Sequence, residues 1–103
     1  MSESRPMGYA TLHVLQAIAS GYVYGFDIMD ATGLPSGTVY PILSKLESSG
    51  LLKSRWEDAR AAKLEGRPPR RSYEITGDGK EALKESVDKY RRLQRMVPRK
   101  ADS

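Results

Sequence analysis

The residues of this sequence that are best suited to bind another molecule are cations clustered past its middle. Five basic side chains fall within the twelve residues 60–71, where Glu65 is the single acidic residue: Arg60, Lys63, Arg67, Arg70 and Arg71. This density of positive charge predicts a polyanionic partner, because cations that neutralise phosphates release the counterions condensed on nucleic acid. The alternative is a solvated, flexible loop. Pro68 and Pro69 stiffen the segment just before the last two arginines.

Residue patterns typical of catalysis or metal binding are missing from the sequence. His13 is the one histidine and lies in an apolar segment, and there is no cysteine to act as a nucleophile or metal ligand. Asp27 and Asp30 are three residues apart, a spacing typical of a solvated helix face. Neither a glycine-rich phosphate loop nor a metal-ligand spacing is present. We therefore expect a protein that is not an enzyme and uses no metal or cofactor.

Length and composition favour one folded domain. The chain has 103 residues, of which 39% are hydrophobic and 29% charged. No stretch approaches the ~20 apolar residues of a membrane span, and the polar first residues do not resemble a signal peptide, so we expect a cytoplasmic protein. Residues 1–50 carry two basic and four acidic side chains, whereas residues 51–103 carry fifteen and nine. A basic half again favours an anionic partner.

The elements that must position these side chains follow from hydrophobic periodicity. Apolar residues at helical spacing predict helices over about 8–20, 24–31 and 36–49, with Ser36 as the cap of the third. Alternating patterns predict two short strands, 52–56 and 72–75, joined as a hairpin by the basic loop. A last helix is expected from a cap at Thr76 to about 97. The fold class is mainly α with a small β-hairpin (α+β), a winged helix-turn-helix.

The third helix is the candidate recognition helix, because its outer face is small and rich in hydroxyl groups. That face, with its N-terminal end, carries Ser36, Gly37, Thr38, Tyr40, Pro41, Ser44 and Lys45. Ser36 and Tyr40 could contact phosphates, while Thr38, Ser44 and Lys45 could reach base edges in the major groove. The alternative for the small residues is a plain surface helix with capping groups.

The last helix is expected to join two copies of the chain. Its apolar residues repeat every ~3.5 positions, the spacing of a helix that packs along another helix: Leu83, Val87, Tyr90, Leu93 and Val97. Packing along the first helix is the alternative, and the two are compatible if the proximal part faces inward. We expect a winged DNA-binding domain over 1–75, a dimerisation helix over 76–97 and a flexible tail over 98–103. Trp56 is expected to pack under the hairpin.

Several of these segments together resemble the PadR-like family of transcriptional regulators. The resemblance runs from about residue 12 to 83 and rests on the sequences at 24–28, 36–43, 46–52 and 70–79. It implies a dimeric winged-helix repressor that contacts DNA through the region of Ser36 to Lys45, with Tyr40 prominent, and through the wing. It also implies, for some members, a planar aromatic effector at the dimer interface. The last helix here lacks the tryptophan that such members use to stack ligands.

The sequence therefore predicts a DNA-binding transcription regulator, a repressor that binds a two-fold symmetric operator as a homodimer. The recognition helix would enter the major groove, and the basic wing would contact the flanking backbone or the minor groove. The alternative is a winged-helix module for protein interaction without specific DNA binding, which a neutral or acidic wing would have favoured.

Overall fold

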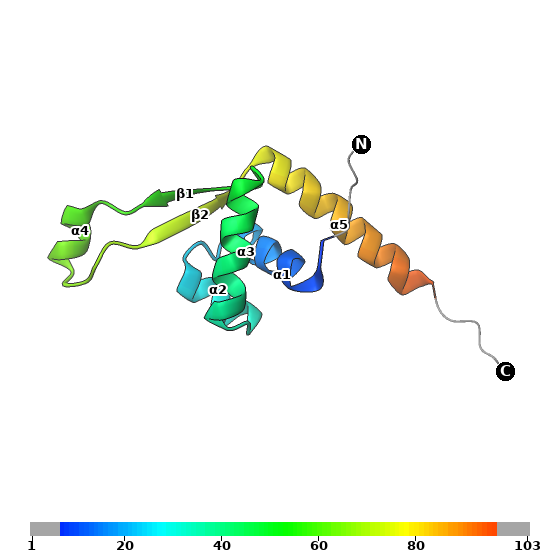
Figure 1. The fold of residues 1–103 in the computed structure, drawn as a ribbon, viewed down its shortest axis with the longest axis horizontal. Helices are drawn as coiled ribbons and strands as arrows, with labels where there is room; N and C mark the ends of the chain where they lie inside the picture. The colour runs from blue at the N-terminus through cyan, green and yellow to red at the C-terminus, as the bar shows by residue number, and fades with distance from the viewer. Residues whose placement is uncertain (1–6, 97–103) are drawn as a thin grey trace.

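A computed structural model describes residues 7–96. Five helices and one hairpin follow each other along the chain (Figure 1): α1 Tyr9–Ala19, α2 Gly25–Thr32, α3 Ser36–Ser48, β1 Leu52–Trp56, α4 Ala59–Leu64, β2 Arg71–Ile75 and α5 Gly77–Arg95. The structure confirms the predicted fold class, mainly helical with a two-stranded antiparallel hairpin. All predicted elements are present, and α4 is an addition.

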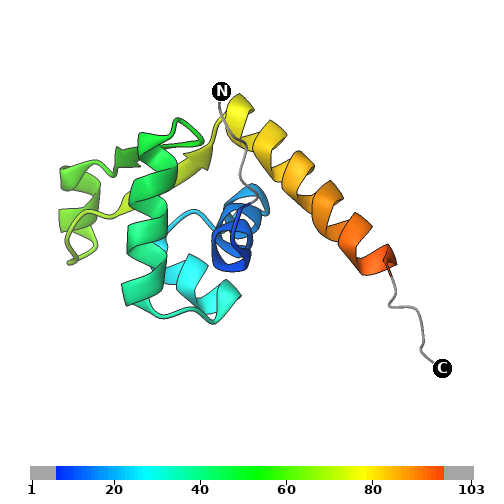
Figure 2. The ribbon, with the colours of Figure 1, turned by 45° about the vertical axis from the view of Figure 1, so that its right-hand side comes forward.

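Helix α1 lies at the centre of the fold and packs against α2, α3, α5 and β2 (Figure 2). Its apolar stripe is buried because neighbours cover it from several sides. The largest fully buried side chains come from α1, α2 and α3: Leu15, Val14, Ile28, Val39 and Leu43. This shared core fixes α3 on the body of the domain while its opposite face stays in solvent.

Helices α2 and α3 form the helix-turn-helix. Gly33 ends α2 with φ of 74°, a left-handed conformation that suits glycine. Thr32 supports the turn, since its hydroxyl donates to the Ile28 carbonyl at 2.8 Å and accepts the Leu34 N–H at 3.2 Å. The expected Ser36 cap is wrong. Pro35 is the N-cap residue, and Ser36 is already the first helical residue, because the extended Pro35 accepts the first helical N–H groups through its own carbonyl.

The hairpin pairs Leu52 with Ile75 and Trp56 with Arg71, so β2 begins one residue earlier than expected. The wing tip is not the loop that we expected, because it contains α4. Asp58 starts this helix by accepting the Arg60 N–H at 2.9 Å, and good helix formers such as Ala62 follow. The glycine and proline residues that suggested a loop all come after α4 ends.

The position of Trp56 is also different from the expectation. Its side chain is 63% exposed, whereas we expected it to pack beneath the hairpin. The core under the hairpin is already occupied by Leu52 and Tyr73, both of which are buried. Trp56 lies two residues further along β1 than Ser54, beyond the part of the strand that covers this core.

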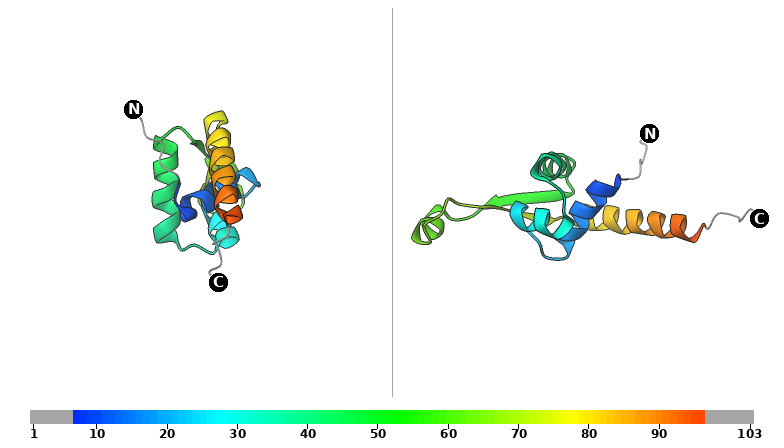
Figure 3. Two further views of the ribbon diagram at one scale, coloured as in Figure 1. Left: turned by 90° about the vertical axis from the view of Figure 1, so that its right-hand side faces the viewer. Right: turned by 90° about the horizontal axis from the view of Figure 1, so that it is seen from below.

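Helix α5 begins at the predicted cap. The Thr76 hydroxyl accepts the Gly79 N–H at 3.0 Å and donates to the Gly50 carbonyl at 2.7 Å, which ties α5 to the end of α3. From there α5 extends away from the hairpin, as the views in Figure 3 show. Its proximal part faces inward, as the alternative interpretation allowed, since Leu83 packs on the core. Leu93 is 59% exposed, and Val97 lies outside the described residues.

Candidate nucleic-acid interface

The outer face of α3 is in solvent, and the predicted recognition residues lie on it or at its N-terminal end. Val39, Leu43 and Leu46 point into the core, which turns the opposite side of the helix outward. Six of the predicted residues are exposed and Thr38 is half-buried; the exposed ones are Ser36, Gly37, Tyr40, Pro41, Ser44 and Lys45. Pro41 lies inside the helix, where it cannot donate a hydrogen bond to the preceding turn. The outward side of α3 is therefore made mostly of small and hydroxyl-bearing residues.

Tyr40 is held by a close contact with Gly25, the first residue of α2. A Cβ atom placed on Gly25 would lie 2.8 Å from the Tyr40 Cζ atom, so a larger residue cannot occupy this position without displacing the ring. Tyr40 nevertheless remains 47% exposed. The glycine thus allows the phenol to lie across the start of α2 while part of the ring faces solvent. The contact gives Gly25 a structural role.

A polar cluster joins the recognition helix to the hairpin. Glu47 of α3 accepts from the Ser54 hydroxyl at 2.6 Å and from the Arg71 guanidinium at 3.0 Å. Arg71 also donates through Nε to the Ser54 oxygen at 3.0 Å. Because α3, β1 and β2 each contribute one member, the cluster fixes the wing relative to the recognition helix.

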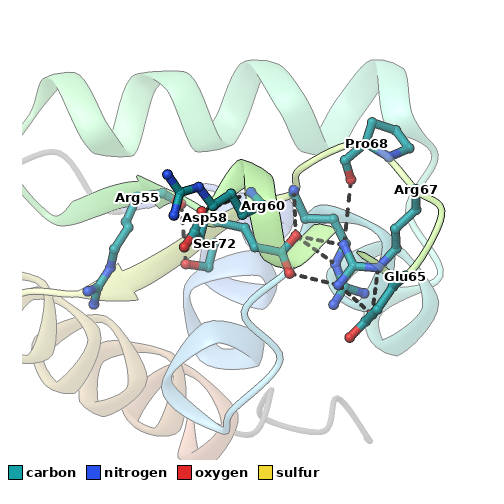
Figure 4. A network of polar contacts seen from close by, with 9 residues as sticks. Arg55, Asp58, Arg60, Glu65, Arg67, Pro68 and Ser72 are labelled. Atoms are coloured by element: carbon teal, nitrogen blue, oxygen red, sulfur yellow. Dashed lines mark hydrogen bonds and ion pairs between the residues drawn. The ribbon is translucent and has the colours of Figure 1, made fainter. Parts of the chain in front are cut away.

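A second cluster organises the wing tip (Figure 4). Arg67 makes two parallel hydrogen bonds to the Glu57 carboxylate, at 2.6 and 2.7 Å, and also contacts Glu65 at 2.9 Å. The Arg70 backbone N–H donates to Glu57 at 3.0 Å. These hydrogen bonds lower the pKa of Glu57 to about 2 and raise that of Arg67. The wing is therefore a folded element with much of the Arg67 charge already neutralised.

The other predicted wing cations are distributed unevenly. Arg60 and Lys63 are exposed on α4, three residues apart, at the far end of the hairpin. Arg70 stacks over the Tyr24 ring at 4.3 Å, and Arg71 belongs to the Glu47 cluster. The sequence prediction omitted Arg55 and Lys53, which are exposed on β1. Strand alternation could have identified them, because both are out of phase with the buried Leu52.

The structure thus brings together two kinds of surface. One is the small, hydroxyl-bearing face of α3, and the other is the cationic hairpin. Helix α4 forms the tip of this hairpin (Figure 1). Phosphate contacts from cations orient a protein on a duplex, while groups that enter a groove read the bases. Both kinds of surface belong to one folded unit. Within residues 7–96, no helix is long and apolar enough to cross a membrane.

Comparison with known proteins agrees with this geometry. The model of the transcriptional regulator PadR-like family matches residues 12–85. A PadR family transcription regulator from Clostridium difficile R20291 superposes with a TM-score of 0.75 at 24% identity, covering 85% of this chain and 93% of that one. A PadR-like transcription factor from Bacteroides fragilis superposes with a TM-score of 0.72 at 25% identity, covering 84% of each chain.

The same fold occurs in BpsR of Bordetella bronchiseptica, whose DNA binding is regulated by 6-hydroxynicotinic acid. Its TM-score is 0.71 at 20% identity, covering 91% of this chain and 67% of BpsR. Comparison with curated proteins gives no match. PadR-family members are DNA-binding regulators and not enzymes, in agreement with the expectation from the residues. The family model covers well over half of the sequence, and the chain therefore belongs to the PadR-like family of transcriptional regulators.

Proposed function

We propose that this protein is a sequence-specific DNA-binding regulator that inserts α3 into the major groove. The observation that carries the proposal is the clamp between Glu47 and Arg71, which holds the exposed α3 face and the cationic hairpin in one fixed arrangement. Ser36 and Tyr40 would contact phosphates, and Thr38, Ser44 and Lys45 would reach base edges. Arg60 and Lys63 would contact the flanking backbone or minor groove.

The proposal includes a homodimer formed through α5. The end of this helix extends beyond the core, and Leu93 is exposed there. Val87 and Tyr90 are half-buried, and the Tyr90 hydroxyl donates to the Met7 carbonyl at 2.9 Å, so Tyr90 lies between α1 and the proposed interface. Pairing two such helices would cover these side chains and place two copies of α3 on a two-fold axis. In this arrangement residues 1–75 form the DNA-binding unit and residues 76–97 the dimerisation helix.

Repression by occupation of a symmetric operator is the regulatory mode that we propose. The regulation of BpsR by 6-hydroxynicotinic acid supports a planar aromatic effector for this fold, and the dimer interface along α5 is its proposed site here. Tyr90 would be its stacking partner, since it is the aromatic residue of α5. The proposed location is the cytoplasm, because a regulator of this kind works at its genes.

Selection of bound duplexes from a random or genomic DNA pool tests the proposal. We expect an enriched, two-fold symmetric site whose affinity falls steeply as salt rises, because phosphate contacts release counterions. Tyr40→Ala and Arg70→Ala should weaken binding to that site while light scattering still reports a dimer. Binding without any enriched sequence would contradict specific regulation, and so would the absence of binding by a folded dimer free of effector.

A further inference from the structure

One face of α5 carries charges that are separated by sign along the helix. Five charged residues follow each other at steps of three or four, which places them on one side of the helix: Asp78, Glu81, Glu85, Lys89 and Arg92. We call this set the charged stripe of α5. Its first three members are acidic and its last two are basic. Lys89 is half-buried and the other four are exposed, so a partner can reach this face.

The charged stripe has no ionic partner in the single chain. Helix α5 packs on α1 and β2, and among residues 7–96 its one ion pair joins Lys84 to Asp88, outside the stripe. Glu81 and Glu85 are like charges four residues apart, and the two basic members are three apart. Like charges at these spacings destabilise an isolated helix. A second surface of opposite charge would relieve both repulsions.

The helix dipole accounts only for the ends of the stripe. Acidic side chains in the first turn and basic ones in the last turn stabilise a helix, and the effect falls off beyond those turns. Asp78 lies in the first turn and Arg92 in the last. Glu85 and Lys89 lie in inner turns, where the dipole has little influence. The change of sign between these two residues therefore needs another cause.

The basic half of the stripe lies beside exposed apolar side chains. Leu93 is 59% exposed and Met96 is 64% exposed, and both belong to the end of α5 that extends beyond the core (Figure 1). A partner that covers this end must offer acidic side chains beside a small or apolar surface. The proximal half of α5 has this character, since Glu81 and Glu85 are exposed there and Ala82 is half-buried.

We propose that the charged stripe selects a second copy of this chain as its partner and aligns the two α5 helices antiparallel. Asp78 of one copy then lies opposite the partner's Arg92, and Glu81 opposite the partner's Lys89. The two copies of Glu85 meet at the two-fold axis, each within one turn of the partner's Lys89. A parallel pair would instead oppose like charges at every position. The proposal rests on the homodimer of the proposed function and adds its orientation.

Reversal of the charges tests the alignment on the full chain, by sedimentation equilibrium without DNA. The acidic-half variant Glu81→Lys/Glu85→Lys and the basic-half variant Lys89→Glu/Arg92→Glu should each raise the dimer Kd about tenfold or more, because like charges then face each other. The chain with all four changes should recover a Kd near that of the wild type. That chain opposes the helix dipole most strongly, so a stripe that served only the dipole would give no recovery.

Arg91→Glu is the matched control, because Arg91 is exposed and adjacent to Arg92 but lies outside the stripe. Its dimer Kd should change much less than that of the basic-half variant. Equal Kd values for the wild type and both half-stripe variants would overturn the proposal. A chain with all four changes that dimerises no better than either half-stripe variant would also overturn it.

Disulfide formation between introduced cysteines reads the alignment without any reversal of charge, since the chain has no cysteine of its own. Asp78 and Arg92 lie ~21 Å apart along the helix. An antiparallel pair should therefore link an Asp78→Cys chain to an Arg92→Cys chain, and should link neither variant to itself. Self-linkage of both variants would show a parallel pair and overturn the proposal, and so would a dimer that forms no mixed disulfide.

The failures of the dimer and of its alignment are distinguishable. A wild-type chain that sediments as a monomer would contradict the homodimer and, with it, the alignment. A dimer that is unaffected by the charge reversals would overturn the alignment alone. Operator affinity is measured on the same variants. A loss of DNA binding in Lys89→Glu/Arg92→Glu with an unchanged dimer Kd would overturn the alignment and assign these cations to DNA.

Discussion

Arg71 on β2 and Glu47 on α3 form an ion pair at 3.0 Å that links the wing to α3 beside their shared core. Ser54 completes the attachment from β1. Both charged side chains are partly exposed, at 40% and 33%, so the pair adds little to global stability. Its main consequence is geometric, because in the proposed complex a duplex contacts α3 and the wing at the same time.

Glu47→Gln is therefore expected to weaken operator binding more than it weakens the fold. The amide keeps a hydrogen-bond acceptor for Ser54 but loses the charge that holds Arg71, so the wing can change its angle to α3. We expect a several-fold rise in Kd with a small change in Tm. Asp88→Asn is the control, since it breaks an exposed ion pair with Lys84 on α5, far from the candidate nucleic-acid interface. Equal Kd values for both variants would contradict the role proposed for the Glu47–Arg71 ion pair in DNA binding.

Gly25→Ala tests the placement of Tyr40. The added methyl group would collide with the phenol ring, so the ring must leave its position across the start of α2. DNA binding should fall about as far as in Tyr40→Ala, measured on the same operator. Gly77→Ala is the matched control, because it also changes the first residue of a helix but meets nothing within 4 Å. Unchanged binding by Gly25→Ala would show that the contact has no functional role.

The wing tip should keep its structure over a wide pH range. The pKa of Glu57 is lowered from 4.5 to about 2 in the folded state. A lowered pKa means that its contribution to stability is present above about pH 4.5 and is lost as the pH falls through about 2. The protection factors of the α4 amides, which correct for the intrinsic pH dependence of exchange, should therefore be constant from neutral pH to about 5 and fall as the pH approaches about 2. In Glu57→Gln, exchange should already be fast at neutral pH, and slow exchange in that variant would contradict the assignment.

The exposed cations of α4 should dominate the electrostatic part of DNA binding. Arg60→Gln and Lys63→Gln are each expected to reduce the slope of log K against log salt by about one for each protomer, or about two for the dimer. Arg67→Gln should act differently, because Arg67 is engaged by Glu57 and Glu65. We expect it to loosen α4, seen as faster amide exchange, with a smaller change in salt slope than the α4 variants show. A larger change in salt slope for Arg67→Gln than for the two α4 variants would place the phosphate contact on Arg67.

Leu93→Asp tests the proposed role of α5. The side chain is 59% exposed in the single chain, so a charge there costs the isolated fold little. In a helix pair it would place two carboxylates in an apolar seam, which is strongly unfavourable. Light scattering should report a monomer with an unchanged helical spectrum. A persistent dimer would exclude this part of α5 from the interface.

The sequence predicted the helices and the hairpin because each has a clear period, and α1 and α3 bury the stripes that the pattern indicated. The stripe of α5 is not buried in the single chain, where Leu83 packs on the core and Leu93 is exposed. It missed α4 because six residues are too few for an apolar stripe, and the local cap at Asp58 decides that helix. Trp56 was misplaced because alternation assigns a residue to one side of a strand but does not show where the underlying core ends. The Glu57–Arg67 pair joins residues ten positions apart, and no short-range pattern identifies it.

Footprinting on the selected operator tests the central claim most directly. A dimer that places two copies of α3 in successive major grooves should protect two half-sites about one helical turn, ~34 Å, apart, with flanking protection from the wings. Tyr40→Ala should lose the half-site protection, and Arg60→Gln should lose the flanking protection first. A single asymmetric footprint, or a symmetric one that survives Tyr40→Ala unchanged, would contradict the account.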